Sequence, residues 1–215
     1  GETRGPTAQP LYGVPFAIKD NIDLAGAGEI QSIVGNGSQS TLSGIVSGTG
    51  NLTTSGNTAI ILSGNNTYTG NTAITSGKVI TTHINALGNN TAMSLSNVSG
   101  AILQLNSSLN IGSLAGGGAT GGHVLLDTGA TLTAGANNTS TTYAGVMSGL
   151  GAFSKAGTGT LTLTSSNTYS GLTTVSAGTL QIGAGLTTGT LGVGNVTVDT
   201  NGLLAFKRSN TYLVN

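Results

Sequence analysis

One stretch decides the fold of this chain: residues 157–183, which read GTGTLTLTSSNTYSGLTTVSAGTLQIG. Within it, apolar residues alternate with threonine or glutamine in two short runs, LTL at 161–163 and LQI at 180–182. Alternation of this kind is typical of β-strands with one buried face, and the Gly, Ser and Asn residues between the runs are typical of turns. The stretch therefore predicts short strands joined by tight turns.

An earlier part of the chain repeats this pattern. A shift of 101 residues superimposes residues 44–79 on residues 145–180 without a gap, and 12 of these 36 positions are identical. Four of the identical positions in each copy serve as landmarks: Asn66, Tyr68, Gly70 and Gly77 in the first, and Asn167, Tyr169, Gly171 and Gly178 in the second. Internal repetition of short strands is the signature of stacked coils. We therefore expect residues 30–215 to form a parallel β-solenoid of roughly eight or nine coils, with long repeats over about 44–142 and 145–215.

Composition agrees with stacked coils. Charged residues make up only 6% of the 215 residues, and the formal net charge is zero. Stacked coils place equivalent side chains about 4.8 Å apart, where like charges repel each other. A neutral chain also lacks the clustered Lys and Arg that nucleic acids attract. The chain has no cysteine, which excludes disulfides and thiolate metal sites. A β-sandwich remains the alternative fold.

The first 29 residues differ from the rest. They contain all three prolines and six of the twelve charged residues, whereas the remaining 186 residues contain no proline. An uninterrupted strand ladder excludes proline because proline cannot donate a backbone hydrogen bond. This shift in composition predicts a boundary between residues 1–29 and residues 30–215.

The larger region resembles a known family. Residues 157–183, and more weakly residues 56–80, resemble the autotransporter-associated β-strand repeat. The resemblance implies a right-handed parallel β-helix in the passenger segment of a bacterial autotransporter. Its expected role is structural: export and display at the cell surface, outside the outer membrane, with a C-terminal translocator barrel as partner in the full-length protein. The alternative is an adhesin that binds a glycan or a host surface, and residues 112–142 are the only candidate insertion.

The short N-terminal region resembles a different family. Residues 10–26 read PLYGVPFAIKDNIDLAG and resemble the amidase signature family. In that family the motif lysine activates a serine nucleophile, and the matching residue here is Lys19. The Gly/Ser-rich segment that should carry the serines is missing, since GSLAGGGATGG at 112–122 has the wrong pattern. Lys19 therefore reads as a relic of an incomplete amidase, on a strand that could cap the solenoid. We expect no catalysis.

Other patterns have ordinary structural explanations. Asp127-Thr128-Gly129 matches the aspartic-protease tripeptide, but one copy is insufficient and a turn is expected. The G-x-G-x-x-G spacing at 116–121 precedes an expected strand rather than the helix a dinucleotide needs. His83 and His123 are isolated, so we expect no metal, and we expect no cofactor. The repeat tyrosines, Tyr68 and Tyr169, are expected to stack or to pack against coil edges.

Overall fold

The chain folds into β-strands and turns. The computed structural model describes residues 22–23, 30–31, 39–88 and 90–211, and no helix occurs among them. Within these residues there is accordingly no helix long and apolar enough to cross a membrane. In the strands, buried and half-exposed residues alternate, as in Thr160–Leu163. The prediction of an all-β fold is confirmed.

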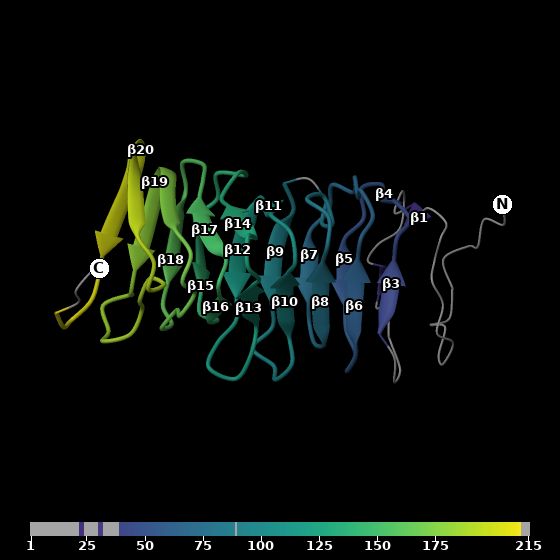
Figure 1. Cartoon of the computed structure of the whole chain (residues 1–215), viewed down its shortest axis with the longest axis horizontal. Coiled ribbons are helices and arrows are strands. Elements are labelled where there is room, and N and C mark those ends of the chain that lie inside the picture. Colours follow the sequence, from purple (N-terminus) through teal and green to yellow (C-terminus); the bar gives the residue numbers. More distant parts are fainter. Residues whose placement is uncertain (1–21, 24–29, 32–38, 89, 212–215) are drawn as a thin grey trace.

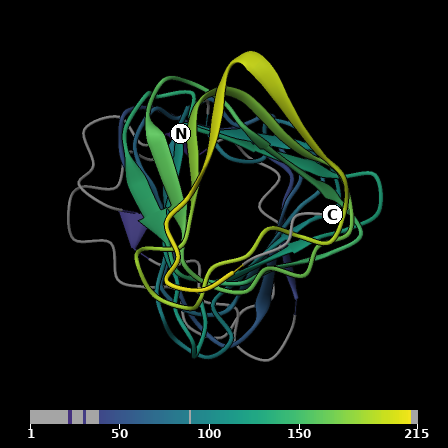
Figure 2. The ribbon, with the colours of Figure 1, turned by 90° about the vertical axis from the view of Figure 1, so that its left-hand side faces the viewer.

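The strands lie on the three sides of an elongated prism, seen end-on in Figure 2. One side is a six-stranded sheet, here called the six-stranded side. Its strands are β3 (Ser40–Leu42), β6 (Ala59–Leu62), β8 (Lys78–Thr81), β10 (Ile102–Leu105), β13 (His123–Leu126) and β16 (Met147–Gly149).

The other two sides belong to one twelve-stranded sheet, because two long strands, β19 (Thr173–Ile182) and β20 (Val196–Phe206), run around the corner between them. The second side consists of β2 (Ile30–Gln31), β5 (Leu52–Thr54), β7 (Thr72–Ile74), β9 (Ala92–Leu95), β12 (Ser113–Gly116), β15 (Thr141–Tyr143), β18 (Thr160–Leu163) and the later halves of β19 and β20. The third side contains β11 (Leu109–Ile111), β14 (Thr131–Ala134), β17 (Ala152–Lys155) and the earlier halves of β19 and β20. A small separate pair joins β1 (Ile22–Asp23) to β4 (Val46–Ser47).

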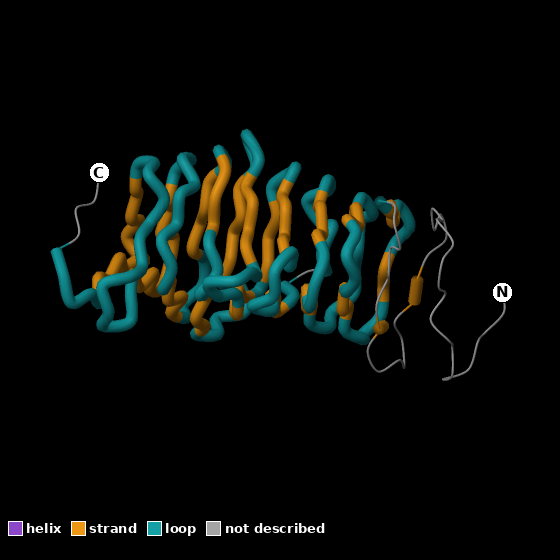
Figure 3. The backbone as a smooth tube through the Cα atoms, turned by 90° about the horizontal axis from the view of Figure 1, so that it is seen from below, coloured by secondary structure: helices purple, strands orange, loops and turns teal. Residues whose placement is uncertain are grey.

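Successive turns stack in parallel, so the strands stand side by side along the molecule (Figures 1 and 3). Residues that pair on neighbouring strands are between 19 positions apart, as for Ile60 and Val79, and 27 positions apart, as for Gly116 and Tyr143. The second side carries nine strands in succession, which corresponds to eight turns. The predicted parallel β-solenoid is confirmed. The alternative β-sandwich is wrong, because every strand pair in the described residues is parallel, whereas a sandwich consists of antiparallel sheets.

The interior is one continuous apolar core. Inward-facing side chains of all three sides meet there, among them Leu62, Leu103, Phe153 and Leu163, each with no exposed surface. The few buried polar residues are mostly threonine and asparagine, together with Lys155. Because each turn packs only on its two neighbours, these buried contacts join consecutive turns rather than distant parts of the chain.

The two repeat copies lie on different sides of the prism. In the first copy, β6 and β8 belong to the six-stranded side, whereas their counterparts in the second copy, β18 and the later half of β19, belong to the second side. From β6 the chain makes four turns, through β8, β10 and β13 to β16. It then continues along the third side, in β17, to β18 on the second side. The 101-residue repeat is therefore not a whole number of turns.

The expected boundary near residue 29, and Lys19 with it, lie outside the described residues. The same holds for the amidase-like stretch, 10–26, except for β1.

Candidate functional site

The landmark asparagines link three consecutive turns. The amide oxygen of Asn66 accepts a 2.8 Å hydrogen bond from the backbone N–H of Val46, one turn earlier, and its amide nitrogen donates a 2.6 Å bond to the carbonyl of Ala86, one turn later. Asn167 repeats this arrangement with Met147 N–H at 2.8 Å and the carbonyl of Thr190 at 2.7 Å. Both asparagines are buried. Each amide thus satisfies one donor and one acceptor that would otherwise be unpaired in the interior.

The landmark tyrosines lie inside the solenoid, where their rings stack against Gly88 and Gly192 of the following turns. Tyr68 and Tyr169 have no exposed surface. Their hydroxyls are 2.6 Å from the hydroxyls of Thr72 and Thr173, respectively. A buried tyrosine hydroxyl usually has a hydrogen-bond partner. The sequence contains the threonine four residues later in each copy, but it does not show that the tyrosine and the threonine face the same interior. Burial raises the pKa of Tyr68, although the hydrogen bond with Thr72 opposes the shift.

The landmark glycines occupy positions that exclude a side chain. A Cβ on Gly70 would lie 2.1 Å from the carbonyl oxygen of Gly50 in the preceding turn, and a Cβ on Gly171 would lie 2.3 Å from that of Gly151. The other pair, Gly77 and Gly178, has positive φ angles of 73° and 64°, a backbone conformation that favours glycine. The four landmark glycines thus stand at sites of close stacking or sharp turning between coils.

One aligned position differs strongly between the copies. Thr54 and Lys155 align under the 101-residue shift, and both are 1% exposed. The hydroxyl of Thr54 has no hydrogen-bond partner among the described residues. The Lys155 ammonium donates to three carbonyls, those of Ala156 at 2.6 Å, Gly157 at 2.9 Å and Ala177 at 3.1 Å. Burial lowers the pKa of Lys155. Three backbone carbonyls therefore accept hydrogen bonds from the buried ammonium group, and this arrangement indicates a structural role for Lys155.

The outer surfaces of the sides differ in chemistry. On the third side, one outward column consists of small polar residues, which stack in the order Asn110, Thr133, Ser154, Thr174 and Thr197. On the six-stranded side, the corresponding column runs through Ile61, Ile80, Gln104 and Leu125. Ile61, Ile80 and Leu125 are half-exposed, and aliphatic side chains that share one outer face make this side a candidate contact area.

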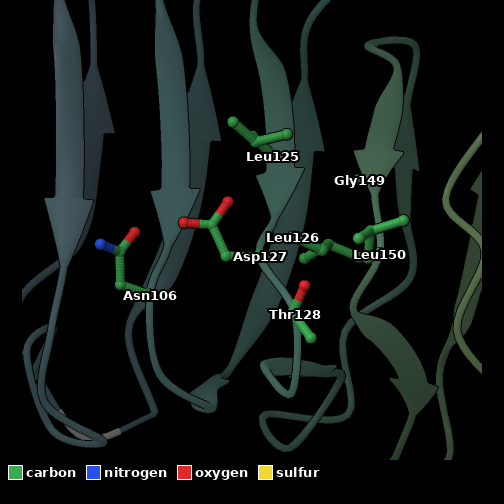
Figure 4. A pocket seen from close by; sticks show the side chains of 7 residues that line it. All are labelled: Asn106, Leu125, Leu126, Asp127, Thr128, Gly149 and Leu150. Atoms are coloured by element: carbon green, nitrogen blue, oxygen red, sulfur yellow. The ribbon is translucent and has the colours of Figure 1, made fainter.

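A shallow hollow of about 550 Å³ interrupts this aliphatic column at its later end (Figure 4). Its lining residues are Asn106, Leu125, Leu126, Asp127, Thr128, Gly149 and Leu150. Leu150 is 65% exposed, so an apolar surface borders the hollow directly. The hollow is the strongest candidate for a binding site among the described residues.

A polar chain runs along the six-stranded side into the hollow. Lys78 Nζ donates a 2.9 Å hydrogen bond to Gln104 Oε1. The amide nitrogen of Gln104 in turn donates to Asn106 Oδ1 at 3.0 Å and to Asp127 Oδ2 at 2.8 Å. These bonds fix the orientation of Asn106 and Asp127, so that the Asn106 amide nitrogen and the second Asp127 oxygen are the atoms left for a ligand.

The Asp-Thr-Gly tripeptide, His123 and the glycine spacing at 116–121 all have structural roles in turns or between turns. Asp127-Thr128-Gly129 ends a strand and forms a turn, closed by a 3.0 Å bond from Ala130 N–H to the Asp127 carbonyl. His123 Nδ1 accepts a 3.1 Å bond from Val146 N–H in the following turn. The G-x-G-x-x-G spacing is followed by β13, a strand. The described residues contain no group of three His, Cys, Asp or Glu that could hold a metal.

The candidate insertion, residues 112–142, contains the longest turn, because Gly116 pairs with Tyr143 across 27 positions. Tyr143 has no exposed surface, and its hydroxyl donates to the carbonyl of Gly122 at 2.8 Å. The N–H groups of Thr120 and Gly121 also donate to Asn97 Oδ1 in the preceding turn, at 2.9 and 3.1 Å, so this long turn is bonded to the solenoid at several points.

Comparisons with known proteins agree with the repeat. A family model described as Passenger-associated-transport-repeat matches residues 52–80 and 153–182. A curated protein, the adhesin BmaC autotransporter of Brucella suis biovar 1 (strain 1330), is 42% identical over 144 residues, which is 66% of this chain. The chain spans 4% of that protein's length. No solved structure matches.

The two matched segments differ by the same 101-residue shift, and each contains one landmark set. The two segments that match the passenger-associated-transport-repeat model are thus the segments whose landmark residues bond neighbouring turns of the parallel β-solenoid together.

Proposed function

We propose that this chain is a structural segment of a bacterial autotransporter passenger, which supports export and presents a surface outside the cell. One observation supports the proposal most strongly. In each matched segment, the landmark asparagine forms hydrogen bonds with both the preceding and the following turn. A chain with such contacts can fold turn by turn, because each completed turn provides the template for the next. Folding of this kind outside the cell would favour outward movement of the chain.

The proposal extends to the whole protein. Its passenger would leave the cell through a C-terminal translocator barrel and remain associated with the outer membrane, with no catalytic activity. Residues 1–29 would form a separate N-terminal piece in which Lys19 is a relic. The similarity to an autotransporter adhesin supports the location of the passenger outside the cell.

The test is a secretion assay. The 215-residue chain is joined to an autotransporter translocator barrel and expressed with a surface epitope. The Asn66→Ala/Asn167→Ala double variant is compared with an Asn65→Ala control, in which an exposed asparagine is removed. We expect the double variant to lower the amount of protease-accessible protein at the surface while the control leaves it unchanged. Equal surface amounts in all three would refute the role of stacking in export.

An adhesin is the second candidate function, and the six-stranded side favours it. Outward-facing Ile61, Ile80 and Leu125 share a column there, interrupted by Gln104, whereas the third side carries a column of small polar residues. A purely structural segment has no need of this difference. Adherence of cells that display the chain should fall when Leu150 is replaced by serine, and unchanged adherence would count against this candidate.

A further inference from the structure

We infer that the hollow at the later end of the six-stranded side binds the neighbouring hydroxyl groups of a neutral saccharide. The inference deepens the adhesin candidate by naming a site and a ligand class. Binding is tested in solution, so its failure would leave export and display unaffected.

The hollow presents a hydrogen-bond donor beside an acceptor. The Gln104 amide nitrogen donates to Asn106 Oδ1 and to Asp127 Oδ2, which leaves the Asn106 amide N–H groups and Asp127 Oδ1 available beside the hydroxyl of Thr128. Asn106 is exposed and Asp127 is half-buried. A hydroxyl group both accepts and donates hydrogen bonds, so two adjacent hydroxyls match this pair. One would accept from Asn106 and the other would donate to Asp127.

Besides the polar pair and Thr128, the lining of the hollow includes three leucines, Leu125, Leu126 and Leu150. Leu125 lies on the outer face of β13 and Leu150 borders the hollow on the next turn (Figure 4). The C–H face of a sugar ring can cover such side chains while its hydroxyls reach the polar pair. Small-molecule sites commonly combine an apolar surface with a few fixed polar groups.

Other ligand classes fit less well. An anion would meet the Asp127 carboxylate, and the described residues contain no carboxylate cluster for a divalent cation. A peptide strand would need an open sheet edge, but β13 is already paired on both sides, to β10 and to β16. A purely apolar ligand would bury the polar pair without partners.

The test is saturation-transfer NMR with the full chain and three probes: methyl α-D-mannopyranoside, methyl β-D-galactopyranoside and N-acetylglucosamine. A shallow, open site predicts a dissociation constant on the order of 1 mM for at least one probe. Asp127→Ala and Asn106→Ala should each weaken binding about fivefold, the loss of one hydrogen bond. Asp199→Ala, which removes an exposed carboxylate in β20 outside the hollow, should not change it.

Circular dichroism melting shows that each variant is folded, and Leu150→Ser provides a second variant outside the polar pair. Two results would overturn the inference. One is no saturation transfer from any of the three probes at about ten times the expected constant. The other is transfer that persists undiminished in both Asp127→Ala and Asn106→Ala.

Discussion

The first and second repeat copies make the same contacts on different sides of the prism. Asn66 and Asn167 bond to the preceding and following turns with nearly equal distances, and Tyr68 and Tyr169 each face a threonine hydroxyl at 2.6 Å. Yet β6 lies on the six-stranded side, whereas its counterpart β18 lies on the second side. The repeat therefore determines the contacts between one turn and the next, but it does not determine the side of the prism on which a segment lies.

The copies also differ in how completely their polar groups are paired. In the first copy, the Thr72 hydroxyl lies 2.9 Å from that of Thr91, which donates to the carbonyl of Gly70 at 2.9 Å. In the second copy, Gly194 rather than a threonine lies against the carbonyl of Gly171, the counterpart of Gly70. The second copy has instead the buried Lys155. The asparagine and glycine contacts are thus the shared requirement, and the hydroxyl chain and the lysine are additions.

The largest expected effect comes from the close-stacking glycines. Gly70→Ala and Gly171→Ala should each lower the free energy of unfolding by more than about 3 kcal/mol, because the new Cβ would overlap a carbonyl oxygen of the preceding turn. Gly129→Ala is the matched control: its φ is 79°, but nothing lies within 4 Å of the added carbon. That change should cost about 1–2 kcal/mol from backbone strain alone. Urea unfolding followed by circular dichroism measures all three, and equal losses would contradict the stacking argument.

The asparagines provide the next effect. Asn66→Ala and Asn167→Ala should each cost about 2–4 kcal/mol, because each leaves a buried N–H and a buried carbonyl without partners. The two losses should be similar, since the contacts do not depend on the side of the prism. Asn65→Ala, at an exposed position, should cost less than about 0.5 kcal/mol. A large loss in one copy alone would break the equivalence of the copies.

Alkaline pH should weaken the solenoid through its buried tyrosines. Burial raises the pKa of both Tyr68 and Tyr143 above the ordinary value of 10.0. Above pH 10 the unfolded chain therefore loses phenolic protons that the folded chain retains, so stability falls as pH rises. Each buried tyrosine contributes a slope of up to about 1.4 kcal/mol per pH unit, which is approached well above pH 10. Below pH 10.5 the lowered pKa of Lys155 adds a slope of the opposite sign, so urea unfolding is followed above pH 10.5, where Tyr143→Phe should reduce the fall in stability by one tyrosine's share. An unchanged slope would contradict the burial.

Substitutions at the aligned residues Thr54 and Lys155 should have the smallest effect on stability, and they test the difference between the two copies. Lys155→Thr installs the residue of the first copy and should cost about 1–2 kcal/mol, because three carbonyls lose a donor. Thr54→Val removes a buried hydroxyl without a partner in the described residues, so stability should stay within about 0.5 kcal/mol or rise. Thermal melting of the two variants measures both. A larger loss in Thr54→Val than in Lys155→Thr would show that the threonine, not the lysine, is the better satisfied residue.

Much of the fold could be predicted from the sequence, and the reason is local. Alternation in LTL at 161–163 and LQI at 180–182 gives the strands, and the 101-residue shift gives the stacking. The side occupied by each strand could not be predicted, because it depends on the summed lengths of all intervening turns, which vary from 19 to 27 residues.

The candidate site was largely missed for the same reason. Gln104, Asn106 and Asp127 meet only because successive turns place them in register, across 23 positions for Gln104 and Asp127. The tripeptide that begins with Asp127 predicts a turn, which the structure confirms, but it gives no sign of the bond from Gln104. Lys155 could have been found: it occupies an inward position in the alternation of β17, where a charged residue is out of place.

Cysteine cross-linking tests the central claim most directly, because the chain has no cysteine of its own. In the structure, Thr162 of β18 is paired with Thr142 of β15 on the second side. If the second copy instead followed the first onto the six-stranded side, Thr162 would stack beyond Ser148 of β16. Neighbouring parallel strands bring paired residues to about 4.8 Å, within reach of a disulfide. Under mild oxidation, the account predicts a disulfide in the Thr142→Cys/Thr162→Cys variant and none in the Ser148→Cys/Thr162→Cys variant, detected by mass spectrometry. The reverse pattern would contradict it.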